Sequence, residues 1–223
     1  MLDPVMDETE FWEIVDRTRE AADGDPEEHA ELLVERLAQL DPDSVLDFAR
    51  HFESRYNRAY TWELWGAAWV LLDGASDDAF DYFRCWLIGQ GREVFEGGVH
   101  DPDQLAELLG DFDEEIDGDG EELGYAADEA YEQLTGAVAP DLGIPLQAAE
   151  PVGAPLDFEN EAVLAERFPR LWDRFRADQA WVPPSMRISV PVMKAPSSEP
   201  SMATTPATAW GPAKPGRWRG RAW

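Results

Sequence analysis

The sequence is poor in cysteine and in long apolar runs. Cys85 is the single cysteine among 223 residues, so no disulfide can form within the chain. The longest apolar run, residues 64–72, is about half of the roughly 20 residues that a membrane-spanning helix needs. The opening segment, residues 1–10, lacks the basic and apolar regions of a secretory signal. We therefore expect a cytoplasmic protein without a membrane span.

Motifs that would identify a reaction are also missing. The chain has no G-x-S-x-G and no phosphate-binding glycine loop, and the Gly-Gln-Gly at 89–91 lacks the third glycine of a dinucleotide site. The histidines, His29, His51 and His100, stand apart without metal-ligand spacing. Among 47 acidic residues many carboxylates are neighbours by chance. A pair of them therefore does not identify a catalytic acid and base. The sequence predicts no cofactor, no metal site and no catalytic residue.

The acidic run at 111–122 is the nearest approach to a metal site. Counting from Asp113, carboxylates fall where a calcium loop has its first ligands, and Gly118 falls at the turn. Gly124, however, occupies the place of the bidentate glutamate that completes such a loop. The run therefore predicts a solvated loop that is weakly cation-binding at most.

Positive charge is scarce in the first part of the chain. The net charge is −29, and residues 1–178 hold 46 of the 47 acidic but only 12 of the 18 basic side chains. Residues 179–223 hold one acidic and six basic side chains. Such an acidic core repels nucleic acid and anionic lipid, so we expect no DNA binding by the core. Its charge suits a basic protein partner, the chain's own basic tail, a cation or a high-salt cytoplasm, and it also keeps a crowded protein soluble.

Helix-start signals recur along residues 1–178 and predict an all-α architecture. Asp7, Asp25 and Asp41 stand where an aspartate can cap a helix, and prolines follow the last two at the first helical position. Gly136 is a stop signal for a helix at 121–135, and Pro169 must bend or divide a helix at 160–178. Other helical patterns, read from apolar spacing, cover residues 8–22, 26–40, 42–60, 62–72, 77–87 and 102–109. The aromatic spacing of the third pattern continues through the fourth as far as Asp73.

The domain organisation follows from these patterns. We expect a single compact multi-helix domain at 1–178 and a Pro/Ser/Ala-rich tail at 179–223 that is mostly disordered. The tail ends in a basic, tryptophan-containing stretch. Its candidate interaction residues are Trp210, Lys214, Arg217, Trp218, Arg219 and Arg221. They suit RNA, an anionic surface or a protein partner, but they could equally dock on the acidic core or have no role.

The aromatic segment 61–95 is the predicted hydrophobic centre, in which Cys85 is buried. It also places polar side chains beside aromatic ones, as a ligand pocket does. The candidate binding residues are Trp62, Trp65, Trp69, Asp77, Asp78 and Arg84. A structural interpretation stays open, in which Ser76 caps a helix, the two aspartates favour its dipole and the arginine pairs locally.

Several stretches carry a family resemblance. TWELWGAAWVL at 61–71, SDDAFDYFRCWLIGQGREVFEGGVHDPDQLAEL at 76–108 and FPRLWDRF at 168–175, with EFWEIVDRTREAA at 10–22, resemble the bacterial domain of unknown function 4240 family. The resemblance covers about residues 7–176 and implies an α-helical domain with no established activity. The family's Trp-Asp-Glu-Asp entry to the last helix is replaced here by Asp-Phe-Glu-Asn at 157–160.

Two functions are consistent with these sequence features. The first is a non-catalytic helical interaction domain whose acidic surface recognises a basic protein or is regulated by the tail. The alternative is a small-molecule-binding protein or enzyme with its pocket at 61–95. The charge asymmetry favours the first.

Overall fold

The computed structural model describes residues 6–113 and 116–176, and it is all-α over those residues, as predicted. The chain divides into two units, Met1–Asp178 and Gln179–Trp223, and every described residue lies in the first. The predicted tail therefore falls outside the described residues. In chain order the elements are α1 (Glu8–Ala21), α2 (Pro26–Leu37), α3 (Pro42–Arg58), α4 (Trp62–Leu71), α5 (Asp77–Gly89), α6 (Arg92–His100), the 3-10 helix η1 (Pro102–Gln104), α7 (Leu105–Leu108), α8 (Glu121–Thr135), α9 (Glu161–Arg167) and α10 (Pro169–Phe175).

Aspartate caps begin the first three helices, as the sequence predicts. The Asp7 carboxylate accepts hydrogen bonds from the backbone N–H groups of Thr9 and Glu10 at 2.8 and 2.9 Å. Asp25 and Asp41 cap α2 and α3 in the same way, each followed by a proline at the first helical position. These carboxylates satisfy donors that have no partner within a helix, and each cap therefore stabilises the first turn of its helix.

Two helix breaks divide patterns that continue in the sequence. The aromatic spacing at 48–72 is continuous, yet α3 ends at Arg58 and α4 begins after Thr61, whose hydroxyl accepts from the Leu64 N–H at 3.1 Å. In the last pattern α9 ends one residue before Phe168 and α10 begins at Pro169. The proline thus marks a junction of two short helices, which was one of the two outcomes expected of it.

One helix, α6, forms where the sequence pattern predicts none. Gly97 and Gly98 lie within it, and glycine weakens a helix by about 1 kcal/mol relative to alanine. The structure shows why these small residues are tolerated. A Cβ atom on Gly97 would lie 2.4 Å from a methyl carbon of Leu108, and one on Gly98 would lie 2.7 Å from a methyl carbon of Leu105. The two glycines therefore allow α7 to pack closely on α6.

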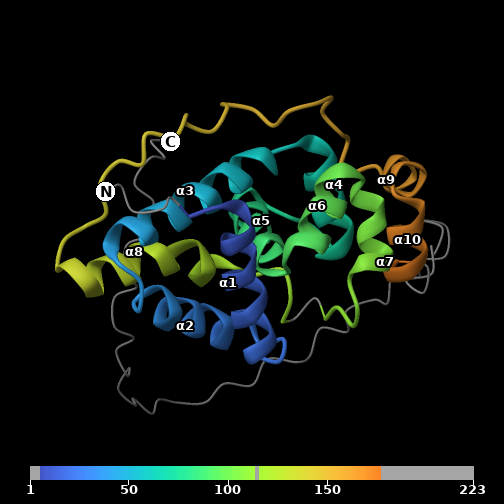
Figure 1. Ribbon diagram of the computed structural model, residues 1–223. Helices are drawn as coiled ribbons and strands as arrows, with labels where there is room; N and C mark the ends of the chain where they lie inside the picture. The colour runs from blue at the N-terminus through green and yellow to red at the C-terminus, as the bar shows by residue number, and fades with distance from the viewer. Residues whose placement is uncertain (1–5, 114–115, 177–223) are drawn as a thin grey trace, which may run out of the picture. The chain divides into compact units, whose positions relative to one another are not determined.

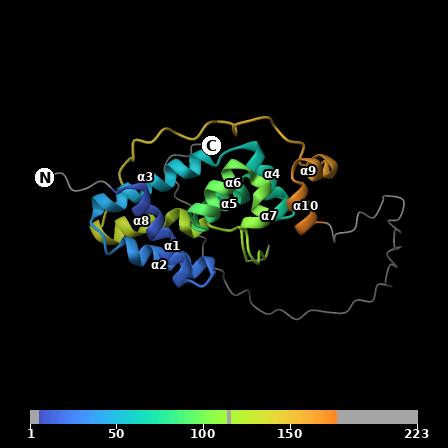
Figure 2. The same ribbon diagram turned by 45° about the vertical axis from the view of Figure 1, so that its right-hand side comes forward.

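The helices form two groups with α5 between them. In the first group α8 packs on α2 and α3, and α1 packs on α2. In the second group α10 packs on α4, α9 and η1, and α6 packs on η1 and α7. Figures 1 and 2 show these groups at opposite ends of the domain. Helix α5 contacts α1, α3 and α8 on one side and α4 and α6 on the other, so it connects the two groups.

Helix α5 is also the centre of the hydrophobic core, within the segment 61–95 that the sequence predicts. Its side chains that are at most 2% exposed include Phe80, Phe83, Cys85, Trp86, Leu87 and Ile88. The burial of the cysteine is thereby confirmed. Gly120, just before α8, lets that helix reach the α5 backbone, because a Cβ atom there would lie 2.2 Å from the backbone nitrogen of Trp86. A backbone atom cannot rotate aside, so only glycine fits.

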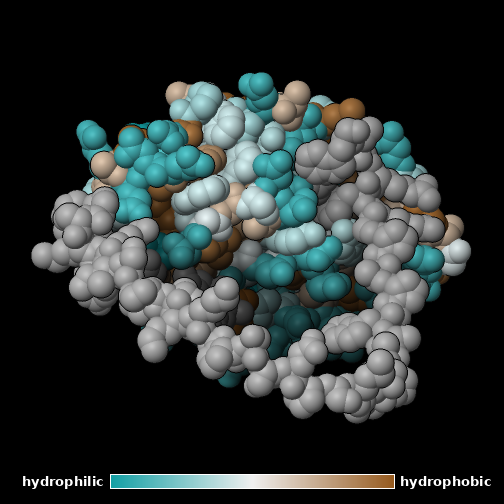
Figure 3. Space-filling model, turned by 180° about the vertical axis from the view of Figure 1, so that it is seen from behind, coloured by the Kyte–Doolittle hydropathy of each residue, from teal (hydrophilic) through white to brown (hydrophobic). Residues whose placement is uncertain are grey.

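The surface is largely polar. Figure 3 shows hydrophilic residues over much of the visible face, with apolar residues in smaller areas between them. The described large apolar side chains that are exposed are Ile116, Leu134, Val138, Leu146 and Val152. No helix in the described part of the chain has the length and apolar character to cross a lipid bilayer.

Candidate functional site

The tryptophans of the predicted site form an aromatic layer on α4. Trp62, Trp65 and Trp69 are half-buried, and the centroids of their rings lie 5.9, 5.6 and 5.1 Å from the ring centroid of Phe158. Trp65 also stacks on Phe80 of α5, with centroids 4.9 Å apart and ring planes 10° from parallel. The layer is therefore packed against other aromatic side chains on two sides.

The polar members of the predicted site differ in burial. Asp77 and Asp78 are exposed in the first turn of α5, where negative charge is favoured by the helix dipole. Arg84, in contrast, is completely buried. Its guanidinium carbon lies 5.0 Å from the ring centroid of Phe80, against which Trp65 stacks. The structure thus joins the arginine to the aromatic layer and leaves the two aspartates in solvent.

Arg84 is surrounded by oxygen atoms from three residues. Its Nη1 donates to the backbone carbonyl of Tyr56 at 3.1 Å and to Oε1 of Gln147 at 2.7 Å. Its Nη2 donates to the Tyr56 hydroxyl at 2.7 Å and to the carboxylate of Asp81. The Tyr56 ring centroid lies 3.7 Å from the guanidinium carbon. These contacts offset the large cost of removing a cation from water.

Tyr60 borders the same cluster. Its ring centroid lies 4.7 Å from the guanidinium carbon of Arg84. Burial raises the pKa of the Tyr60 hydroxyl, and the positive charge of Arg84 opposes that rise. The side chain is therefore a neutral phenol near neutral pH, and Arg84 and Asp81 are the charged members of the cluster.

Gln147 belongs to a segment without helix, residues 137–157, which we call the strap. Figure 1 shows the strap passing over α3 on its way from α8 to α9. Its backbone is bound at Val152, whose N–H donates to the Tyr60 carbonyl at 2.9 Å and whose carbonyl accepts from the Trp62 N–H at 3.0 Å. Pro145 accepts a side-chain hydrogen bond from α3 at 3.3 Å. The strap thus covers the Arg84 cluster from outside the helices.

A cleft of about 320 Å³ lies between the α1–α2 turn, the last turns of α5 and the loop at 111–117. Arg19, His29, Trp86 and Leu123 contribute to its lining. Its remaining charged residues are Asp23, Asp25, Asp111, Asp113 and Asp117. We call it the acidic cleft. Its lining comes from distant segments of the chain, and the sequence offers no spacing that would unite them.

Two buried side chains line the acidic cleft. His29 is 3% exposed, and its Nε2 lies 3.0 Å from the hydroxyl oxygen of Thr18. That hydroxyl donates to backbone carbonyls of α1, those of Ile14 and Val15, so Nε2 carries the imidazole proton and donates to it. Trp86 is 2% exposed, and its indole Nε1 has no hydrogen-bond partner among the described residues.

His29 makes the fold sensitive to acid. Burial, and secondarily the charge of Arg19, lowers the pKa of His29 from 6.5 to about 4. Between these values the unfolded chain binds a proton that the folded chain excludes, so stability falls as the pH falls. We expect His29 to account for about 2 kcal/mol of the free energy of unfolding lost between pH 7 and pH 5. Urea unfolding of the wild type and of His29→Gln at both pH values measures this share, and equal losses in the two proteins would contradict it.

The described part of the chain holds no group of three or more His, Cys, Asp or Glu side chains placed to bind a metal ion. In the acidic run, the Asp117 carboxylate accepts a hydrogen bond from the Asp113 N–H at 2.9 Å. That carboxylate therefore closes a turn within its own loop.

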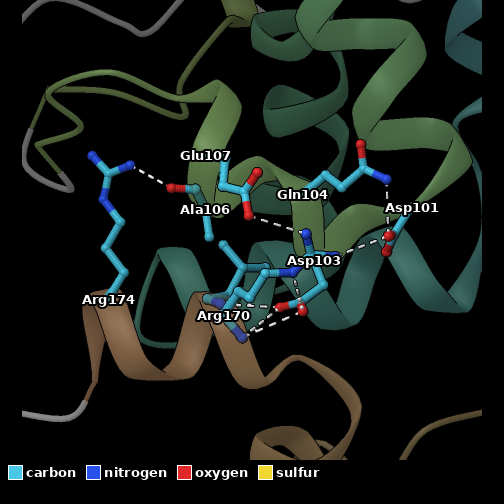
Figure 4. Close-up of polar contacts among 8 residues, drawn as sticks. Asp101, Asp103, Gln104, Ala106, Glu107, Arg170 and Arg174 are labelled. Atoms are coloured by element: carbon cyan, nitrogen blue, oxygen red, sulfur yellow. Dashed lines mark hydrogen bonds and ion pairs between the residues drawn. The ribbon is translucent and has the colours of Figure 1, made fainter.

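The arginines of the domain are used internally. All 12 basic residues of the first unit are arginines in the described part, and nine of them form ion pairs. Figure 4 shows the largest cluster, in which Arg170 meets Asp101, Asp103 and Glu107 at 3.0, 3.0 and 3.2 Å. In the same view Arg174 donates to the backbone carbonyl of Ala106 in α7. It also donates to the backbone carbonyl of Leu109, just after that helix, at 2.7 Å. These contacts attach α10 to η1 and α7.

The candidate residues in the tail, Trp210 to Arg221, lie outside the described residues. Their proposed roles stay predictions.

Comparison with known families adds one match. Residues 6–133 match the family model described as "Protein of unknown function (DUF4240)". The chain belongs to this family. The DUF4240 match contains Arg84 and every residue of the acidic cleft, but it ends before the strap, α9 and α10. No curated protein and no solved structure matches the chain.

Proposed function

We propose that this DUF4240 protein is a non-catalytic interaction domain that binds a basic protein through its acidic surface, centred on the acidic cleft. Complementary charge steers such partners together and selects against acidic competitors. The cleft gives the surface a concave point at which a lysine or arginine side chain of the partner can be enclosed.

The observation that carries this proposal is the way in which the domain uses its charges. Its 12 arginines face 46 acidic residues in the first unit, and nine of the arginines are taken up in internal ion pairs. The excess carboxylates turn outward, and four of the five cleft aspartates are exposed. Arg19 is the arginine that lines the cleft, beside five aspartates, and a surface with such an excess of negative charge attracts a positively charged partner.

The direct test is the binding of a labelled arginine-rich peptide to the full chain. The affected variant replaces Asp23, Asp25, Asp111 and Asp113 with asparagine. Asparagine tolerates the positive φ of 49° at residue 23, and it also caps helices, as residue 25 must. We expect binding about tenfold weaker than in the wild type, and wild-type affinity that falls with added salt.

The matched control removes the same charge elsewhere. Glu31, Glu35, Glu93 and Glu132 are exposed on α2, α6 and α8 and do not line the cleft. Their replacement with glutamine should weaken binding by less than half as much on a logarithmic scale. An equal effect of the two variants would show that the peptide binds the acidic surface as a whole and not the cleft in particular. Peptide affinity that does not respond to salt would refute it.

A small-molecule pocket at 61–95 is less well supported. Trp62, Trp65 and Trp69 pack on Phe158, and the strap covers Arg84. The acidic cleft is lined by Trp86 and Gln90 of the same segment, but by none of these four predicted residues.

A further inference from the structure

The surroundings of Arg84 combine features of a ligand site. The guanidinium is fully buried, and three aromatic rings face it, those of Tyr56, Tyr60 and Phe80. The acidic partner that faces it is Asp81. These residues combine flat aromatic surfaces with one charged hydrogen-bond donor, which is the usual composition of a small-molecule pocket.

The hydrogen bonds of Arg84 leave room for a stronger acceptor. Its Nε is buried and has no hydrogen-bond partner among the described residues. Its Nη1 donates to the side-chain oxygen of Gln147, a neutral acceptor. A carboxylate oxygen in that place would make a charge-assisted bond, which is shorter and roughly twice as strong.

The strap that supplies Gln147 is held mainly by its backbone. Leu146, the residue before the glutamine, is 77% exposed, and Val152 is 66% exposed. The strap contains no helix, and two of its side-chain-to-backbone hydrogen bonds are long, from Arg50 at 3.4 Å and from Asn57 at 3.3 Å. A segment with so little buried apolar area opens at a lower free energy than the whole domain unfolds.

The boundary of the family match separates the site from its cover. Arg84, Asp81 and the three aromatic residues lie within the matched residues 6–133, whereas Gln147 lies beyond them. The arginine cluster therefore lies in the part of the chain that matches the family model, and the glutamine that contacts it lies outside that match.

We propose that Gln147 is an internal substitute for a ligand, and that opening of the strap turns the Arg84 cluster into a binding site for a small monocarboxylate with an aromatic or apolar body. The aromatic walls suit such a body. One negative charge is favoured over a phosphate dianion because Asp81 already faces the single cation, and because the chain as a whole is strongly negative. This inference is independent of the proposed protein-binding function.

The test uses the full chain and benzoate as the probe, with neutral benzamide as its uncharged analogue. Gln147→Ala removes the internal ligand, and Leu146→Ala changes an exposed neighbour on the same strap. Benzoate affinity is measured by calorimetry, and the Nε–H signal of Arg84 is followed by NMR. We expect Gln147→Ala to bind benzoate about tenfold more tightly than the wild type, because the closed state no longer competes. The Arg84 signal should shift on titration.

Gln147→Glu supplies the complementary result, because a tethered carboxylate should fill the site and weaken benzoate binding below that of the wild type. Leu146→Ala should bind as the wild type does, and benzamide should bind Gln147→Ala much more weakly than benzoate. The inference is overturned by equal benzoate affinities in Gln147→Ala and the wild type. It is also overturned by an equal gain in Leu146→Ala, or by benzoate binding that leaves the Arg84 signal in place.

Discussion

Replacement of Arg84 by methionine is expected to lower the free energy of unfolding by about 3–5 kcal/mol, because the loss of one partner from a buried ion pair leaves the other charge uncompensated. Methionine fills a similar volume, but it donates no hydrogen bond to Asp81, Tyr56 or Gln147, which all accept from the arginine. Urea unfolding monitored by circular dichroism measures the change.

Two further variants serve as controls for this measurement. Arg17→Met removes an arginine whose ion pair with Glu13 is exposed, and we expect a change within about 0.5 kcal/mol. Arg84→Met combined with Asp81→Leu removes both charges and should recover part of the loss. If Arg84→Met costs no more than Arg17→Met, then the buried cluster contributes nothing to stability.

Replacement of Asp103 by alanine should lower the free energy of unfolding by about 3 kcal/mol, because it removes a helix cap and the buried carboxylate that accepts from Arg170. Asp103 is 6% exposed. Its carboxylate accepts from the backbone N–H groups of Arg170 and Leu171, both at 3.0 Å, and from Nε of Arg170 at 3.0 Å. One side chain therefore both caps α10 and attaches it to η1. Chemical denaturation gives the total, and hydrogen exchange of the α10 amides shows whether that helix opens first.

The conservative variant separates the two roles of this carboxylate. Asp103→Asn keeps an oxygen that can cap α10 but removes the charge that faces Arg170, so its cost should be about half as large. Asp101→Ala serves as the control, because Asp101 meets Arg170 at a side chain that is 40% exposed. Equal costs for Asp103→Ala and Asp101→Ala would show that the cap is unimportant.

The helices were largely predictable because their signals are local. An aspartate cap, a proline at the first turn and a glycine stop act within a few residues, so the sequence indicates α1, α2 and α3 and the end of α8 at Gly136, whose φ is 67°. The aromatic spacing continues across the break between α3 and α4, so that spacing does not indicate where α3 ends. Helix α6 could not be predicted from the sequence, because glycine disfavours a helix. Its glycines are needed for the close approach of Leu105 and Leu108, which belong to another helix.

The candidate site was less predictable than the helices for a related reason. Arg84 was named from its position among aromatic residues, and its neighbours on α5 could be read from the sequence. The contact with Gln147 joins residues 63 positions apart, and nothing in the strap signals it. The acidic cleft likewise unites the α1–α2 turn with a loop almost ninety residues later, and the chain's abundance of aspartate conceals which of them meet.

The last two helices lie beyond the family match, yet they complete the apolar interior of the domain. Leu164, Phe168 and Leu171 are at most 2% exposed, and a Cβ atom on Gly66 of α4 would lie 2.7 Å from the Phe168 ring. A recombinant fragment that stops at residue 133 would therefore expose an apolar surface on α4 and should precipitate or self-associate. Fragments intended for crystallisation or for binding assays should extend at least to Arg176.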